Sequence, residues 1–150
     1  MNSSRTENGT HRCVIAFGGN IGNVDACFKT ALAALEQAGF RTERMSSVIT
    51  TAPVDCEAGT PDFRNAVATG YWQGDDPVSL LRLCQKLEVL SGRPGDHARN
   101  VSRTLDLDLI LFGDIRMNTP ELILPHPRAK DRDFVRIPLA EIAPELLEKL

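Results

Sequence analysis

The sequence lacks the features that mark several large classes of protein. With a formal net charge of -3 over 150 residues it has no cationic excess, which argues against a general nucleic-acid or membrane-surface binder. No apolar run approaches the roughly 20 residues that span a bilayer, and the first twelve residues contain no apolar signal core. We therefore expect a cytoplasmic protein with a flexible tail at 1–12 and a single domain at 13–150.

The sequence also lacks paired cysteines. There is no C-x-x-C pair and no histidine at zinc-binding spacing, so a zinc site is not indicated. We expect each of the four cysteines to be a small buried hydrophobe; they are Cys13, Cys27, Cys56 and Cys84. The turn Gly18-Gly19-Asn20-Ile21-Gly22 does not match a dinucleotide-binding or Walker phosphate loop. It favours a tight turn between a strand and a helix.

The most informative stretch of the chain is residues 103–113. Its residues alternate with the period of two that places side chains on opposite faces of a strand. One face carries Leu105, Leu107, Leu109 and Leu111, and the other carries Asp106, Asp108, Ile110 and Phe112. The pattern predicts a strand that runs from a polar cleft into a buried sheet. Same-face Cα atoms lie about 6.5 to 7 Å apart, so the two carboxylates require a positive partner between them.

The residues alone leave two interpretations of this aspartate pair open. The first is a surface strand whose carboxylates are solvated or paired with Arg103. The second is a divalent-cation site, because carboxylate oxygens hold Mg²⁺ and leave its other positions to water and phosphate. The loop at 91–102 favours the second, since it carries Arg93, His97 and Arg99 and could clamp a metal-bound polyphosphate.

The order of the expected elements indicates the fold class. Period and turn signals predict strand, helix, strand, strand, helix and strand in succession, at 13–17, 24–38, 41–51, 63–72, 78–90 and 105–112. This is the split βαβ arrangement of a ferredoxin-like α+β fold, with two helices on one face of an antiparallel sheet. The segment 134–150 reads as helical, with interruptions at Pro138 and Pro144. The later elements should extend the sheet or cover its other side.

Three further features have both a structural and a functional interpretation. Asn65 shares a strand face with Phe63, so its amide either makes a buried structural hydrogen bond or recognises a flat heterocycle. His126 lies between two prolines and is either a structural hydrogen-bonding group or a phosphate contact. Gln85 and Glu88 share a helix edge directed toward the arginine-containing loop.

Several short segments occur together in a specific order and spacing, although each alone is a weak signal. They are Phe17-Gly18-Gly19-Asn20, Thr51-Ala52-Pro53, Pro61-Asp62-Phe63-Arg64-Asn65, Arg103-Thr104-Leu105-Asp106-Leu107-Asp108, Pro125-His126-Pro127-Arg128 and Arg132-Asp133-Phe134-Val135. Through these segments the chain from Val14 to Leu146 resembles the 6-hydroxymethyl-7,8-dihydropterin pyrophosphokinases of folate biosynthesis.

The resemblance implies transfer of pyrophosphate from ATP to the hydroxymethyl group of the pterin, with release of AMP. It implies that two Mg²⁺ ions are held by Asp106 and Asp108, and that ATP is the co-substrate. The implied catalytic residues are Arg93, Arg103, Asp106 and Asp108. The implied ATP-binding residues are Gln85, Glu88, Arg93, Arg103, Leu109, His126 and Arg132. The implied pterin-binding residues are Thr51, Pro53, Val54, Phe63, Asn65 and Phe134. We expect a monomer whose partners are small molecules, with no nucleic acid and no membrane.

The loop before the aspartates departs from the family pattern. Gly95 stands where a second arginine is common, and Asn100-Val101-Ser102 replaces a Gly-Pro pattern. Arg99 or His97 could supply the missing cation. Three alternatives follow: a catalytically weak pterin-binding homologue, a ligand-sensing module of the same fold that needs no Mg²⁺, and a metal-dependent phosphohydrolase or nucleotidyltransferase that uses the same acid pair.

Overall fold

The computed structural model describes residues 9–53, 58–91 and 105–150. Its elements follow in the order β1 (Thr10–Gly19), α1 (Val24–Gln37), β2 (Arg41–Met45), β3 (Ile49–Thr51), β4 (Phe63–Gln73), α2 (Pro77–Leu90), β5 (Asp106–Phe112), β6 (Met117–Asn118), β7 (Ile123–Leu124), η1 (Ala129–Asp131), α3 (Asp133–Ile142) and η2 (Pro144–Lys149). None of the helices in these ranges has the length and apolar character needed to cross a membrane.

The sheet has the strand order that the split βαβ arrangement requires. Its strands lie in the order β2-β4-β1-β5, and β3 also pairs with β4. Every pairing in this sheet is antiparallel. The predicted ferredoxin-like α+β fold is therefore confirmed, with β6 and β7 forming a separate two-stranded sheet.

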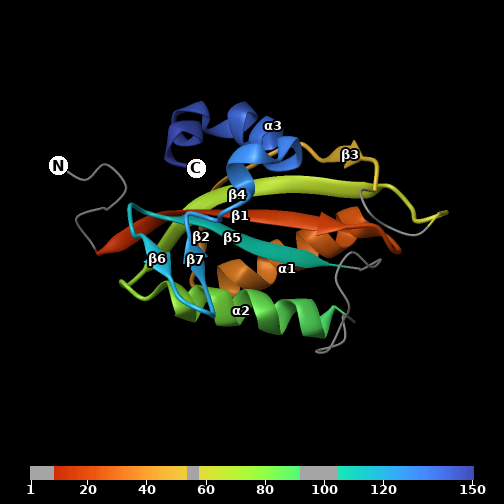
Figure 1. The fold of residues 1–150 in the computed structure, drawn as a ribbon. Coiled ribbons are helices and arrows are strands. Elements are labelled where there is room, and N and C mark those ends of the chain that lie inside the picture. Colours follow the sequence, from red (N-terminus) through yellow and green to blue (C-terminus); the bar gives the residue numbers. More distant parts are fainter. Residues whose placement is uncertain (1–8, 54–57, 92–104) are drawn as a thin grey trace.

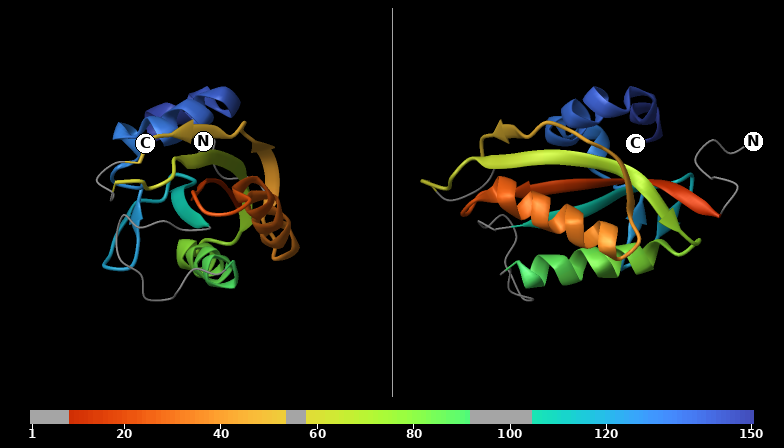
Figure 2. Two further views of the ribbon diagram at one scale, coloured as in Figure 1. Left: turned by 90° about the vertical axis from the view of Figure 1, so that its right-hand side faces the viewer. Right: turned by 180° about the vertical axis from the view of Figure 1, so that it is seen from behind.

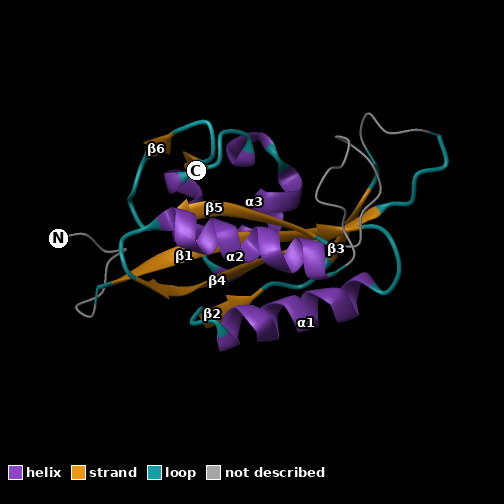
Figure 3. Ribbon diagram, turned by 90° about the horizontal axis from the view of Figure 1, so that it is seen from below, coloured by secondary structure: helices purple, strands orange, loops and turns teal. Residues whose placement is uncertain are grey.

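Helices cover both faces of the sheet. Helices α1 and α2 lie side by side on one face, while α3 and η2 lie on the other (Figure 1, Figure 2 and Figure 3). The larger apolar core lies under α1 and α2, where Phe28, Leu35 and Leu80 are buried together with Phe17 of β1. A smaller core lies under α3 and η2. The added C-terminal helices thus cover the second face, as the sequence predicted.

Two side chains begin the helices of the first face. The Asn23 side chain accepts a hydrogen bond from the Ala26 N–H at 3.1 Å at the start of α1. The Asp76 side chain accepts one from the Val78 N–H at 3.0 Å, and Pro77 stands in the first turn of α2. Both caps satisfy N–H groups that a helix leaves without partners at its start, which is why the helices begin at these residues.

Strand β5 differs from the predicted alternation in its second half. Val14 of β1 pairs with Leu111, whereas Ile15 pairs with Leu109, so Ile110 is an extra residue in a β-bulge. The bulge exchanges the faces of the next two residues. Phe112 joins the core under α1 and α2, and Leu111 joins the smaller core with Ile110. The prediction that Phe112 follows the aspartate face was therefore wrong.

Three boundaries also differ from the sequence prediction. Strand β1 begins at Thr10, inside the segment expected to be a tail, because residues 10–12 pair with the end of β4. The expected strand at 41–51 is divided into β2 and β3. Helix α3 continues through Pro138 to Ile142. Pro138 is buried on the sheet-facing side of α3, where apolar packing offsets the hydrogen bond that proline cannot donate.

Candidate active site

The two aspartates of β5 lie on the face of the sheet that α3 covers only in part. Asp106 pairs with Gly18 of β1, and Asp108 pairs with Ala16. Both aspartates are half-buried, whereas Leu107 between them is buried in the core under α2. The first half of the predicted alternation is thus confirmed, and it leaves both carboxylates on the half-open side of the strand.

Gly18 makes a hollow between the aspartates and the amide of Asn65. In the sheet, Gly18 pairs with Asn65 on one side and with Asp106 on the other. A Cβ atom added to Gly18 would stand 3.2 Å from the Asn65 Oδ1 atom and 3.9 Å from the Asp106 Cβ atom. A flat ligand that rests on the Gly18 backbone would therefore touch both an amide and a carboxylate.

Asn65 is buried, with 6% of its surface exposed. Its Nδ2 group donates a hydrogen bond to the Thr51 hydroxyl at 2.9 Å. Phe63 pairs with Thr51 in the register of β3 and β4, so it lies on the same face two residues before Asn65. The structure brings together these three residues from the predicted pterin set, and the Asn65 amide has the structural hydrogen bond that the sequence left as one alternative.

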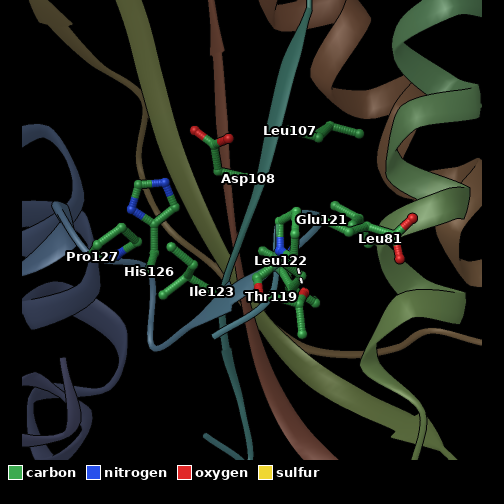
Figure 4. Close-up of a pocket in the computed structure, with 11 residues that line it drawn as sticks. Leu81, Leu107, Asp108, Thr119, Glu121, Leu122, Ile123, His126 and Pro127 are labelled. Atoms are coloured by element: carbon green, nitrogen blue, oxygen red, sulfur yellow. Dashed lines mark hydrogen bonds between the residues drawn. The ribbon is translucent and has the colours of Figure 1, made fainter. Parts of the chain in front are cut away.

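The segment after β7 places His126 beside the aspartates. The His126 N–H donates to the Ile110 carbonyl at 3.0 Å, which holds the segment against the bulge of β5. Figure 4 shows the His126 ring and the Asp108 carboxylate on the same side of β5, while Leu107 points to the other side. The structure therefore brings together these two predicted site residues from distant parts of the chain.

The surroundings of His126 favour the neutral imidazole. Burial lowers the pKa of His126, and the positive charges of Arg132 and Arg128 lower it further, against a smaller opposing effect of Asp106. The Nδ1 atom accepts a hydrogen bond from the Arg128 N–H at 3.3 Å. A neutral ring that accepts at Nδ1 carries its proton on Nε2. This group can donate to a phosphate oxygen without adding a positive charge.

Arg132 and Phe134 stand together at the start of α3. The Arg132 guanidinium lies 5.3 Å from the centroid of the Phe134 ring, within the range of a cation–π contact. Phe134 is half-buried and packs against the smaller core. One face of the ring is thus directed by packing, and the adjacent arginine provides a planar group for anion binding.

A cavity of about 280 Å³ lies along the outer edge of β5, next to Asp108 and His126. Leu109, predicted on the ATP side, lines this cavity as well. The other lining residues come from α2, from β5 and from the segment around β7, and are shown in Figure 4: Leu81, Leu107, Thr119, Pro120, Glu121, Leu122, Ile123 and Pro127. Sequence reasoning missed these residues, although the apolar segment 122–124 just before His126 was a usable signal.

Glu88 of α2 contacts the strand between the two aspartates. Its Oε2 atom accepts a hydrogen bond from the Leu107 N–H at 2.8 Å. Gln85, less than one turn earlier, is exposed. Three predicted site residues, Val54, Arg93 and Arg103, lie outside the described residues, as do His97 and Arg99.

The described residues fit a magnesium site of the open kind. Within 9–53, 58–91 and 105–150, no group of three or more His, Cys, Asp or Glu side chains is arranged to hold a metal ion. Two half-buried carboxylates on one strand face supply the hard oxygen ligands that Mg²⁺ prefers. Magnesium commonly takes its remaining ligands from water and substrate phosphates. The aspartate pair therefore fits Mg²⁺ bound together with a polyphosphate.

Comparison with known proteins assigns the chain to a family. The sequence model of the 7,8-dihydro-6-hydroxymethylpterin-pyrophosphokinase family matches residues 14–144. The chain belongs to this family. The resemblance drawn from the sequence motifs is thereby confirmed.

Curated relatives and solved structures agree with this family. The chain is 38% identical over 133 residues to the 2-amino-4-hydroxy-6-hydroxymethyldihydropteridine pyrophosphokinase of Bacillus subtilis, covering 88% of this chain and 78% of the relative. It is 37% identical over 132 residues to a mitochondrial folate synthesis bifunctional protein of Arabidopsis thaliana, covering 88% of this chain but only 23% of the relative. A crystal structure of HPPK-DHPS from Plasmodium falciparum with STZ-DHP matches the fold with a TM-score of 0.72 at 16% identity, covering 93% of this chain and 43% of that chain.

Proposed function

We propose that this chain transfers a pyrophosphoryl group from ATP to the hydroxymethyl oxygen of 6-hydroxymethyl-7,8-dihydropterin, releasing AMP, in folate biosynthesis. Membership of the family and the name of the Bacillus subtilis relative support this activity. The structural observation that carries it is the hollow over Gly18, which has Asn65 on one side and Asp106 on the other. A pterin in this hollow would present its hydroxymethyl group toward the aspartates while its ring edge contacts the amide.

The pterin-binding part of the proposal uses five described residues and Val54. The Asn65 Nδ2 group is held by Thr51, so its Oδ1 atom accepts from the donor groups on the pterin edge. The rings of Phe63 and Phe134 cover the two faces of the pterin, and Pro53 and Val54 close the rim. Aromatic groups suit a flat heterocycle because stacking buries a large area with a defined geometry.

The ATP-binding part uses the cavity along β5. Its apolar wall of leucines and Ile123 suits the base and sugar of the nucleotide. Asp108 and His126 stand at the cavity, and the latter donates from Nε2 to a phosphate oxygen. Arg132, Arg93 and Arg103 contact phosphates, while Gln85 and Glu88 support the nucleotide side. Planar guanidinium groups suit this role because they bind phosphate oxygens through two parallel hydrogen bonds.

Asp106 and Asp108 are the residues that would hold two Mg²⁺ ions. When bound, such ions neutralise and orient the phosphates of ATP. In the transfer, the pterin oxygen forms a bond to the β-phosphorus as the bond from that phosphorus to the α,β-bridging oxygen breaks, and AMP leaves with that oxygen. We assign Asp108 to assist loss of the hydroxyl proton. Full turnover in an Asp108→Glu variant would contradict this assignment.

The rest of the proposal concerns the state of the protein. We propose that residues 13–150 act as one monomeric domain in the cytoplasm, with small molecules as its only partners. The chain spans 23% and 26% of the two bifunctional Arabidopsis relatives, whose further segments have no counterpart in the 150 residues. Sedimentation of the purified chain with and without ATP would test the monomeric state.

A coupled experiment tests the activity. The purified protein is mixed with ATP, Mg²⁺ and 6-hydroxymethyl-7,8-dihydropterin, and AMP is measured, with the Asp106→Asn/Asp108→Asn variant as the blank. We expect AMP that requires the pterin and disappears in the blank. Pterin binding without AMP would contradict the proposal and indicate a weak homologue or a sensing module. Release of inorganic phosphate, or a nucleotidylated acceptor, would indicate one of the other metal-dependent enzymes.

A further inference from the structure

Arg64 joins three elements on the helix-covered face of the sheet. It stands between Phe63 and Asn65 in β4, and its side chain forms a two-point contact with Asp25 in the first turn of α1. The Nε–Oδ1 distance is 2.6 Å and the Nη2–Oδ2 distance is 2.8 Å. Its third nitrogen, Nη1, donates to the Thr50 hydroxyl of β3 at 3.2 Å. One guanidinium therefore connects α1, β3 and β4.

The neighbours of these residues make a matching contact on the opposite face. Thr50 pairs with Arg64 in the register of β3 and β4, and the next residues along the two strands are Thr51 and Asn65. Side chains of successive strand residues point to opposite faces. The Arg64–Thr50 contact therefore lies on the helix-covered face, and the Asn65–Thr51 hydrogen bond lies on the face that carries the proposed pterin site.

Strand β3 depends on such contacts because it is short. It contains three residues, Ile49–Thr51, and its pairing within the described sheet is with β4. Three residues contribute few ladder hydrogen bonds, and short elements open locally at low free-energy cost. A side-chain contact that anchors Thr50 thus also determines where the Thr51 hydroxyl lies.

We propose that Arg64, acting through Asp25 and Thr50, is a positioning residue for pterin recognition. It fixes β3 against β4, and this keeps the Thr51 hydroxyl in place as the acceptor for the Asn65 Nδ2 group. With Nδ2 occupied, the Oδ1 atom stays directed at the hollow over Gly18, where it meets the pterin edge. This inference rests on the proposed function, because it assigns Arg64 to the selection of that substrate.

A purely structural role for Arg64 predicts a different result. The side chains of Arg64 and Asp25 are 40% and 48% exposed, and exposed ion pairs contribute little to stability. If the pair only stabilised the fold, its loss would lower the unfolding temperature slightly and would not change one substrate constant selectively. A positioning role predicts a change in KM for the pterin with little change in KM for ATP.

The test compares Arg64→Leu, Asp25→Asn and the double variant with the natural chain. We expect the KM for pterin to rise about three- to tenfold in each, the size of one lost neutral hydrogen bond. The KM for ATP, and kcat at saturating pterin, should stay within twofold. The double variant should be no worse than Arg64→Leu, since both changes break the same contact. Arg64→Lys, which keeps the charge but not the two-point contact, should give an intermediate KM.

Lys149→Leu is the matched control, because Lys149 forms an exposed ion pair with Asp114 in another part of the molecule. Its KM for pterin should equal that of the natural chain. An unchanged pterin KM in Arg64→Leu, or the same rise in Lys149→Leu, would overturn the positioning role. If the natural chain itself forms no pterin-dependent AMP, the proposed function fails instead. The two failures are therefore distinguished in one series of assays.

Discussion

The Glu88 carboxylate accepts the backbone N–H of Leu107 at 2.8 Å, and Leu107 is the residue between the two aspartates of β5. The contact connects α2 to the point of the strand from which both carboxylates extend. Glu88 was predicted from the sequence to support the nucleotide side. The hydrogen bond indicates that it also holds the backbone on which Asp106 and Asp108 depend.

This contact gives the first prediction. Glu88→Ala leaves the N–H of the buried Leu107 without its acceptor, so we expect the free energy of unfolding to fall by about 1–3 kcal/mol and kcat to decrease. Glu88→Gln keeps an oxygen acceptor at the same distance and should retain most of both quantities. Urea unfolding and AMP formation are the measurements. Equal losses in the two variants would show that the negative charge, and not the hydrogen bond, is what matters.

The second prediction concerns pH and His126. Burial and the neighbouring arginines lower the pKa of His126 below its ordinary value of 6.5, so the unfolded chain binds a proton at a higher pH than the folded chain does. This residue therefore makes stability decrease as the pH falls below about 6.5 toward its lower folded pKa. In His126→Asn this contribution is absent. We expect a smaller loss of stability for the variant between pH 7.5 and 5.5, measured by urea unfolding.

The third prediction concerns the hollow over Gly18. In Gly18→Ala the added methyl group stands 3.2 Å from Asn65 Oδ1, so the amide must shift and part of the hollow is filled. We expect the affinity for the pterin to fall about fivefold or more, since overpacking typically costs at least 1 kcal/mol. Pterin fluorescence titration measures it. ATP affinity serves as the internal reference, and an equal decrease in both affinities would argue against a pterin-specific hollow.

The fourth prediction concerns the cavity beside Asp108. Ile123 lines this cavity and is 41% exposed. Ile123→Asp places a charge in its apolar wall, and we expect the KM for ATP to rise about tenfold. Ile137 of α3 is 54% exposed and does not line the cavity. Ile137→Asp should therefore leave the KM for ATP unchanged, and a similar rise in both variants would contradict the assignment of the cavity to the nucleotide.

The sequence predicted the features that depend on local patterns. Alternation placed Asp106 and Asp108 on one face, and the order of the elements gave the split βαβ sheet, because both follow from periods of two and 3.6. The exchange of Leu111 and Phe112 could not be predicted in this way. It depends on the bulge opposite Val14 and Ile15, and pairing between distant strands leaves no local signal.

The cavity was missed for a related reason. Its wall combines Leu81 of α2 with Ile123 of β7 and Leu109 of β5, and only tertiary packing brings these segments together. The continuation of α3 through Pro138 is a second case in which packing on the sheet outweighs a local propensity. The roles assigned to Arg93, Arg103 and Val54 stay predictions, because these residues lie outside the described part of the chain.

The bulge at Ile110 makes the two halves of β5 independent in phase. A strand without it would couple the direction of the aspartates to the burial of Phe112, so that a change of one residue in length would turn an entire face over. With the extra residue, the half that carries the acids is aligned by Gly18 and the other half by Cys13. The sheet can therefore tolerate changes in the packing around Phe112 without rotating the carboxylates. Deletion of Ile110 would remove this freedom and force one half of the strand to present its side chains to the wrong layer.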